Sequence, residues 1–482
     1  MDAALRQRGC TVSASSDFYV GTSGYEDTRR LDELRATEYR HLDEHGQIYL
    51  DYTGSGVAAA AQLRAHVERL TSRCYGNPHS ENPTSSASTA LVDRARERIL
   101  AFFNASPDEY AVVFTANATG ACRLVGEAYP FEPGARLVLT GDNHNSVNGL
   151  REFARARGAG IVHVPVRGPE LRVEGEEVGA ALADHRGLLV YPAQSNFTGV
   201  QHPLAWIDQA HAHGYDVLLD AAAFVPANRL DLGRTRPDFV PVSWYKVFGY
   251  PTGVGCLVAR RDALARLRRP WFAGGTIQAV SALGDWHVLA PDETAFEDGT
   301  LNFLSIPDVE FGVDWVDGIG MDLIHLRVTC LTDLLLRRLA GLRHSDGSPM
   351  IRLYGPDGTD RRGGTVAFNV LGARGGIVDE RIVARDTAAA GISIRTGCFC
   401  NPGAGEGAFE IPERALRLTA HRRMRTLDDY LGVLGLPSGG AVRASLGLVS
   451  NIADVERLIG FLAAAYRDRE PDATGLKPRE RC

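Results

Sequence analysis

Short apolar runs alternate with amphipathic stretches of helical period through the middle of the chain, and this alternation limits the fold more than any other feature. The runs, which predict seven strands, are 110–115, 135–140, 161–166, 187–193, 215–222, 238–245 and 254–260. Strands that alternate with helices form a mainly parallel sheet with helices on both faces. We therefore predict a three-layer α/β domain with its ligand site beyond the carboxyl ends of the strands.

The rest of the sequence predicts a second, smaller domain and two terminal segments. Residues 1–48 are polar and predict an N-terminal arm, and the large domain then spans 49–304. Helical periodicity predicts one connecting helix over 305–342. Mixed patterns over 343–466 predict a smaller α+β domain, and the polar residues 467–482 are typical of a frayed tail.

Composition and charge argue against several classes of function. The 52 basic and 59 acidic residues give a net charge of −7, which argues against nucleic acid as the main partner. No apolar run reaches the roughly 18 residues of a membrane helix, and the N-terminus does not have the pattern of a signal peptide. We therefore expect a cytoplasmic protein whose 8 cysteines are mostly reduced. Six of them are predicted as packing or surface thiols: Cys10, Cys74, Cys122, Cys256, Cys330 and Cys482.

Two ionisable residues stand at the ends of apolar runs. Lys246 follows PVSWY and precedes a glycine-rich turn, and Asp220 follows VLL. Alone, the lysine is typical of a solvated strand end and the aspartate of a turn. A buried lysine, however, has a lowered pKa and can form a Schiff base, and a buried carboxylate keeps the ring nitrogen of pyridoxal 5′-phosphate (PLP) protonated. The pair indicates a PLP site if both side chains reach one crevice.

Four further polar residues follow predicted strands or precede Lys246. Thr119 begins a predicted helix, whose free N–H groups attract phosphate, and the Ser243 hydroxyl is a second phosphate donor. His144 has the chemistry to stack on a cofactor ring and transfer protons, and Asn196 to bond the phenolic oxygen. Each alone is as typical of a helix cap or surface loop. Their compatible order at successive strand ends favours the PLP site.

The motifs resemble those of fold type I PLP enzymes of the class V aminotransferase and cysteine desulfurase superfamily. Within it, the chain is most similar to the N-terminal sulfurase domain of molybdenum cofactor sulfurases. The resemblance extends from about Tyr49 to Leu462. It rests on YLDYTGSG (49–56), YGNPHSEN (75–82), FTANATGA (114–121), DAAAFVP (220–226), DFVPVSWYKVFGYPTGVG (238–255), FEDGTLNF (296–303), RTGCFCNPGAG (395–405) and VRASLGLVSN (442–451).

This resemblance implies a role for each matching residue. Thr300, in FEDGT, matches a residue that reaches the phosphate bound by a neighbouring subunit, which implies a homodimer. Arg443 matches the arginine that binds the substrate carboxylate through two parallel hydrogen bonds. The cofactor positions are Lys246 for the Schiff base, Asp220 for the ring nitrogen, His144 for ring stacking, Asn196 for the phenolate, and Ala118, Thr119 and Ser243 for the phosphate cup.

A C-x-C pair, Cys398 and Cys400, lies in the predicted small domain. The resemblance implies that Cys400 takes sulfur from the substrate, which requires a thiolate on a mobile segment. The glycine-rich residues 401–410 are typical of such a loop. Half of a zinc site and a strained Cys398–Cys400 disulfide are the alternatives, although no second cysteine pair is present for zinc. The role of Cys398, as a resolving or a packing thiol, stays open.

The sequence departs from the desulfurase pattern at two positions. Many desulfurases have glutamine three residues after the aspartate, where this chain has Ala223. Many have histidine before the lysine, where this chain has Tyr245, as the sulfurase group does. The first change removes one contact near the cofactor oxygen.

Together these features predict a PLP-dependent cysteine desulfurase or sulfurtransferase. L-Cysteine would bind through Arg443, Lys246 and His144 would move its α-proton, and Cys400 would take its sulfur and leave L-alanine. The sulfur acceptor, a molybdenum cofactor or another acceptor, stays open. The alternatives are another PLP reaction on an amino acid, such as C–S lysis, transamination or epimerisation, and a non-enzymatic scaffold. The RTGCFC motif favours desulfuration because the alternatives do not need Cys400.

Overall fold

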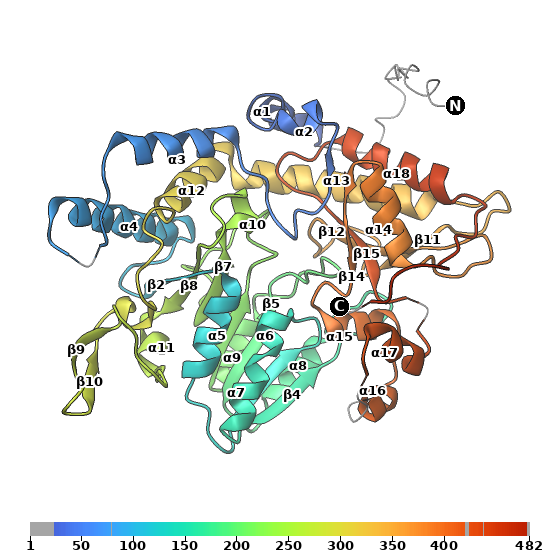
Figure 1. The fold of residues 1–482 in the computed structure, drawn as a ribbon. Helices are drawn as coiled ribbons and strands as arrows, with labels where there is room; N and C mark the ends of the chain where they lie inside the picture. Colours follow the sequence, from blue (N-terminus) through green and yellow to red (C-terminus); the bar gives the residue numbers. More distant parts are fainter. Residues whose placement is uncertain (1–23, 79, 420–423, 437, 480–482) are drawn as a thin grey trace.

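The computed structural model describes residues 24–78, 80–419, 424–436 and 438–479 (Figure 1). The predictions for Cys10, for Cys482 and for the first part of the N-terminal arm lie outside these residues. Within the described ranges, no helix combines the length and the apolar character needed to cross a membrane.

The large unit is built on a sheet whose strands match the predicted runs (Figure 1). In the described part of the chain it has seven strands, in the spatial order β2-β8-β7-β6-β5-β3-β4. Strand β8 is antiparallel to both neighbours, and the other pairs are parallel, so the predicted mainly parallel sheet is confirmed. The strands are β2 (Tyr110–Thr115), β3 (Arg136–Thr140), β4 (Gly160–Val164), β5 (Gly187–Pro192), β6 (Tyr215–Asp220), β7 (Phe239–Ser243) and β8 (Gly255–Arg260).

Helices cover both faces of this sheet because successive strand residues point to opposite sides. In β5, Leu188 and Val190 pack in one core with α5 (Ala118–Ala128) and α7 (Leu150–Ala156). Leu189 and Tyr191 belong to the core of the other face. That face is covered by α4 (Pro83–Phe102), α8 (Gly175–Leu182) and α9 (Trp206–Ala212). The predicted three-layer arrangement is therefore confirmed.

The segment between the two units is two helices, whereas one connecting helix was predicted. Helix α12 (Pro307–Ile319) ends at Gly320, whose φ of +99° is outside the helical region, and α13 (Met321–Gly341) follows. Helix α13 extends toward the smaller unit and packs on α18 (Ile452–Tyr466) (Figure 1). Gly320 therefore gives the chain a change of direction that periodicity alone did not predict.

The smaller unit contains an antiparallel sheet in the order β11-β12-β15-β14. Its strands are β11 (Ile351–Tyr354), β12 (Thr365–Val370), β14 (Arg395–Gly397) and β15 (Ala441–Ser445). The chain before the large sheet also reaches this unit, since β1 (Ile48–Tyr49) pairs in parallel with β13 (Ile392–Ser393). This pairing carries Asp51 to β15, where it forms a bridge with Ser445.

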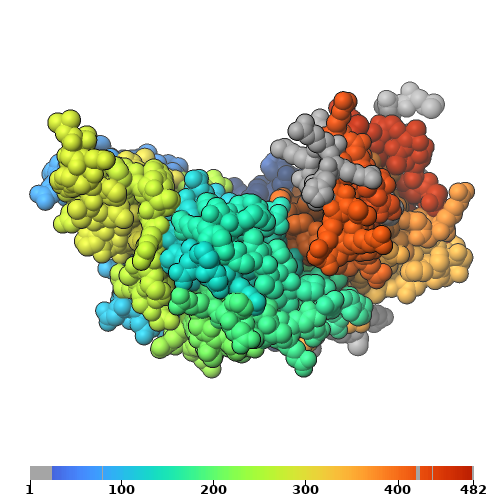
Figure 2. Space-filling model, turned by 90° about the horizontal axis from the view of Figure 1, so that it is seen from below, coloured from blue at the N-terminus to red at the C-terminus, as the bar shows by residue number. Residues whose placement is uncertain are grey.

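A hairpin without a counterpart in the prediction projects from the large unit. It is formed by β9 (Ile277–Ser281) and β10 (Trp286–Leu289), and Figure 2 shows it in yellow at the upper left. Its exposed apolar side chains are Val280, Leu283, Trp286 and Val288. The register places Trp286 and Val288 on one face of the hairpin and Val280 on the other. Exposed apolar side chains grouped on one projecting hairpin are typical of a contact with another protein chain.

The remaining described elements are short or terminal. They are η2 (Glu26–Thr28), α1 (Arg30–Glu38), α2 (His41–Glu44), α3 (Ala60–Ser72), α6 (Asn145–Asn148), α10 (Trp244–Phe248), α11 (Arg261–Arg266), η3 (Glu293–Phe296), α14 (Glu380–Ala389), α15 (Pro402–Ala408), α16 (Glu413–Thr419) and α17 (Leu427–Leu434).

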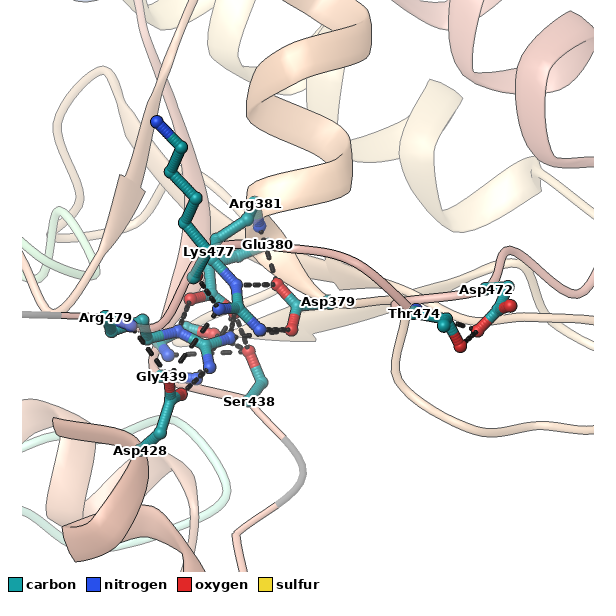
Figure 3. Close-up of polar contacts among 11 residues, drawn as sticks. Asp379, Glu380, Arg381, Asp428, Ser438, Gly439, Asp472, Thr474, Lys477 and Arg479 are labelled. Carbon is teal, nitrogen blue, oxygen red and sulfur yellow. Dashed lines mark hydrogen bonds and ion pairs between the residues drawn. The ribbon is translucent and has the colours of Figure 1, made fainter. Parts of the chain in front are cut away.

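The described part of the C-terminal tail does not fray as predicted, because Arg479 ties it to the smaller unit (Figure 3). Its guanidinium lies 2.8 Å from Asp379, 2.6 Å from Glu380 and within ion-pair distance of Asp428. The side chains of Arg479 and Asp379 are each 9% exposed, and that of Glu380 is 4% exposed. A charged residue near the end of the chain thus neutralises carboxylates from two helical segments.

Replacement of Arg479 by alanine should lower the free energy of unfolding by about 2–3 kcal/mol, because buried carboxylates are left without their partner. The shift is measured by urea denaturation of the full chain. Arg417→Ala is the matched control, since the Arg417–Glu413 pair is exposed to solvent on both sides. Equal free energies of unfolding for the two variants would contradict this stabilising role of Arg479.

Candidate functional site

The polar residues that follow the strands gather around one cavity of about 240 Å³. It lies at the carboxyl edge of the large sheet and is closed on one side by residues of β14 and β15. The predicted residues that line it are Ala118, Thr119, His144, Asn196, Asp220, Ser243, Lys246, Cys400 and Arg443. Ala223 and Tyr245, the two departures from the desulfurase pattern, line it as well.

Lys246 and Asp220 meet inside this cavity. Asp220 ends β6, is 8% exposed and accepts a hydrogen bond from the Ala222 N–H at 3.0 Å. Lys246 lies on the short helix α10, because β7 ends at Ser243, two residues before the predicted strand end at 245. Burial lowers the pKa of the Lys246 amine, although the Asp220 charge acts in the opposite direction. A buried amine with a lowered pKa is a nucleophile near neutral pH.

The N-terminus of α5 forms a cradle for an anion. Asn117 caps the helix by accepting from the Gly120 N–H at 3.0 Å, and the Ala118 N–H donates to the Ser243 hydroxyl at 2.8 Å. The Thr119 hydroxyl lies 2.7 Å from that of Ser146. A helix N-terminus together with three hydroxyls suits a phosphate. Asn117 and Ser146 were not predicted.

His144 and Asn196 have partners that orient them. The His144 Nδ1 accepts from the Ser146 N–H at 3.0 Å. Burial lowers the pKa of His144, and the Lys246 charge adds to this effect, so the ring favours its neutral form. The Asn196 amide donates to the Phe399 carbonyl at 2.8 Å and accepts from the Asn401 amide at 2.8 Å.

Arg443 lies on β15 and forms a charged cluster that the sequence did not predict. Its guanidinium is 2.9 Å from Asp51, which also pairs with Arg395 at 2.7 Å. Arg395 and Arg443 are register partners on β14 and β15, so both cations line the same cavity. Burial lowers the pKa of Arg443 to about 10, although Asp51 opposes the shift. Among the described residues, the buried Arg443 Nε has no hydrogen-bond partner.

Cys400 is an exposed free thiol on the rim of the cavity. A disulfide with Cys398 is therefore not formed. The prediction of a glycine-rich loop after it is wrong for Pro402–Ala408, which forms helix α15. Glycine is needed in this helix because neighbouring atoms pack closely against it. A Cβ on Gly403 would lie 2.1 Å from the Gly141 oxygen, and a Cβ on Gly407 would lie 2.4 Å from the Val166 side chain.

Thr300 is the predicted residue that does not join this cavity. It lines a different cavity of about 380 Å³, together with Trp271 and Asp298. Its hydroxyl accepts from the Asn77 amide at 3.3 Å.

Sequence reasoning missed Asp51, Arg395, Asn117 and Asn401. Asp51 and Arg395 stand inside quoted motifs, but their pairing depends on two strands more than 300 positions apart in the sequence. A signal was available in part, since an arginine three residues before a C-x-C pair supplies positive charge beside a thiol.

The fold and the cavity together define the class of protein, an α/β enzyme that uses PLP. The sequence model of the class-V aminotransferase family matches residues 48–458, and the chain belongs to that family. Its cofactor is PLP, and the residues present fit it. The cradle suits the phosphate, Asp220 the ring nitrogen and Lys246 the aldehyde carbon.

Known proteins resemble the chain over most of its length. It is 35% identical over 462 residues to the molybdenum cofactor sulfurase of Bos taurus, with 90% of this chain and 52% of that protein covered. It is 33% identical to the Arabidopsis thaliana molybdenum cofactor sulfurase, with 98% and 61% covered. The chain thus spans about half to three-fifths of the length of these relatives. The apo cysteine desulfurase of Thermococcus onnurineus NA1 superposes with a TM-score of 0.75 at 23% identity, over 90% of this chain and 97% of that one.

Proposed function

We propose that this chain is a PLP-dependent cysteine desulfurase, which converts L-cysteine into L-alanine and keeps the sulfur as a persulfide on Cys400. The observation that carries the proposal is that one cavity joins an exposed thiol, a partly buried lysine and a buried arginine. Transamination and epimerisation need the lysine and the arginine but do not need a thiol at the rim.

The chain's own residues have separate tasks in this reaction. Arg443 binds the substrate carboxylate, and the Asp51 carboxylate keeps that guanidinium in place. PLP, when bound, accepts electrons from the substrate α-carbon. The neutral amine of Lys246 takes the α-proton, with the neutral His144 ring beside it to share the proton.

Cys400 carries out the sulfur transfer. Its thiolate attacks the substrate sulfur, an S–S bond forms, the substrate C–S bond breaks, and the carbon takes a proton to become the methyl group of alanine. The net change is cysteine plus a thiol to alanine plus a persulfide, with no external oxidant. Arg395 and Arg443 line the same cavity as Cys400 and place positive charge there.

Product analysis tests the function. Purified holoenzyme given L-cysteine and dithiothreitol should release alanine and sulfide in equal amounts, as measured by amino-acid analysis and a sulfide assay. Pyruvate and ammonia in place of alanine would mean β-elimination and would overturn the proposal. Replacing dithiothreitol with candidate acceptors, including a molybdenum cofactor, then identifies the physiological acceptor, which we propose is either that cofactor or another sulfur acceptor.

We further propose a homodimer in the cytoplasm and a division of the chain into domains at 49–304 and 343–466. The dimer is supported by Thr300, which lies outside the cavity of its own chain and is available to a second copy. The exposed apolar hairpin β9–β10 adds surface for such a contact.

A further inference from the structure

The backbone around Cys400 is held by hydrogen bonds from the large unit. The Asn145 N–H donates to the Cys400 carbonyl at 2.7 Å, and the Asn196 amide donates to the preceding carbonyl, that of Phe399, at 2.8 Å. The next residue, Asn401, donates to the Asp142 carbonyl at 2.7 Å and to the Asn196 side-chain oxygen at 2.8 Å. Three consecutive residues are thus fastened to loops that follow β3 and β5.

Packing around the same segment leaves little space for movement. Asn401 is fully buried, and it also caps α15 by accepting from the Ala404 N–H at 3.2 Å. The Phe399 ring lies edge-on to Phe197, with centroids 5.1 Å apart, and under the Arg443 guanidinium at 4.8 Å. The two ring contacts join the segment to the loop after β5 and to β15.

The backbone conformation also depends on these contacts. Phe399 and Cys400 have φ values of +55° and +53°, a left-handed conformation that costs free energy for residues other than glycine. Two such residues in succession persist where surrounding contacts determine the backbone. The Cys400 side chain, in contrast, is exposed. The main chain is therefore fixed while the thiol faces both the cavity and solvent.

We propose that Asn401, together with Asn196, is a latch that holds Cys400 at the rim of the cavity. The thiol then takes sulfur from the substrate and transfers it to the acceptor without a movement of its backbone. Asn401 is then a positioning residue, and the acceptor comes to the cysteine. This inference rests on the proposed function of Cys400 as the sulfur carrier.

The handover needs no movement of the segment. An acceptor thiolate attacks the outer sulfur of the Cys400 persulfide, the S–S bond breaks, and the Cys400 thiolate leaves with its electron pair. The acceptor receives one sulfur atom, and Cys400 is again free of persulfide and can react with the next substrate.

Asn401→Asp separates the latch from the helix cap. The aspartate keeps an acceptor for the Ala404 N–H but loses the amide donor, and its charge faces the Asp142 carbonyl and the Asn196 oxygen. Asn401→Ser, a good cap too short for the latch, is a second variant. The matched control is Asn82→Asp, because Asn82 also caps a helix that begins with proline, but at an exposed site.

Two measurements that do not depend on turnover test the latch. The first is hydrogen exchange of the backbone amides of residues 399–404. The second is the rate at which iodoacetamide alkylates Cys400 in cofactor-free protein, followed by mass spectrometry of its peptide. Both should rise about 10-fold in the two Asn401 variants and stay unchanged in Asn82→Asp. Cofactor absorbance and thermal unfolding establish that each variant is folded.

Kinetics add a result that a structural role alone would not give. The Asn401 variants should lose about 10-fold or more in kcat with KM for L-cysteine nearly unchanged, because the carboxylate site remains intact. Unchanged exchange and alkylation rates in both variants would overturn the latch. If the wild type makes no alanine but exchange and alkylation still rise in the two Asn401 variants, the latch is supported and the desulfurase proposal fails.

Discussion

Replacement of Lys246 by alanine is expected to abolish the covalent attachment of PLP and to lower turnover of L-cysteine by about 10⁴-fold or more. The reason is that one amine holds the cofactor aldehyde and also moves the substrate proton. Burial lowers the pKa of the Lys246 amine, although the Asp220 charge acts in the opposite direction, and a lower pKa favours the reactive neutral form. Absorbance spectra of the dialysed protein and an alanine assay measure the two losses.

The composition of the chain provides an unusually clean control for this experiment. The sequence contains two lysines, Lys246 and Lys477. Lys477→Ala should keep both the visible absorbance and full turnover. After borohydride reduction of the wild type, the pyridoxyl group should appear on the peptide that contains Lys246. Its appearance on the Lys477 peptide, or retained colour in dialysed Lys246→Ala protein, would contradict the assignment.

Replacement of Cys400 by serine should lower alanine and sulfide production by about 10³-fold or more, with the visible absorbance of bound PLP unchanged. A serine hydroxyl is a poor nucleophile toward sulfur, whereas a cysteine thiolate attacks sulfur readily. A discontinuous assay of alanine, together with a spectrum of the same sample, measures both effects.

Cys74→Ser is the matched control for Cys400→Ser, because Cys74 is also an exposed free thiol and does not line the cavity. It should turn over L-cysteine at the wild-type rate. If Cys400→Ser kept full activity, the thiol would be outside the mechanism and a C–S lyase or another PLP reaction would be the better explanation.

The large sheet was predictable because local patterns determine it. Runs such as 110–115 and 187–193 are apolar on both faces, as strands covered by helices must be, and each became a strand. The residues at their carboxyl ends could then be assigned to one edge without knowledge of any contact. Asp220 and Ser243 lie at that edge as predicted.

Other features depended on packing that no local pattern contains. The glycines of α15 were read as signs of flexibility, but Gly403 is needed for close approach to Gly141. Lys246 moved from a strand end onto a helix because the chain turns after Ser243 and packs against residues 56–58. The Asp51–Arg443 pair requires β1 to cross to the smaller unit, which only the tertiary structure reveals.

The left-handed backbone at Phe399 and Cys400 has a consequence for protein engineering. A stabilisation strategy guided by backbone dihedrals alone would place glycine at both positions, since glycine tolerates that region without steric cost. At position 400 it would erase the nucleophile, and at position 399 the aromatic surface beneath the Arg443 guanidinium. Redesign for thermal stability should therefore keep Phe399 and Cys400 and introduce stabilising substitutions at other positions.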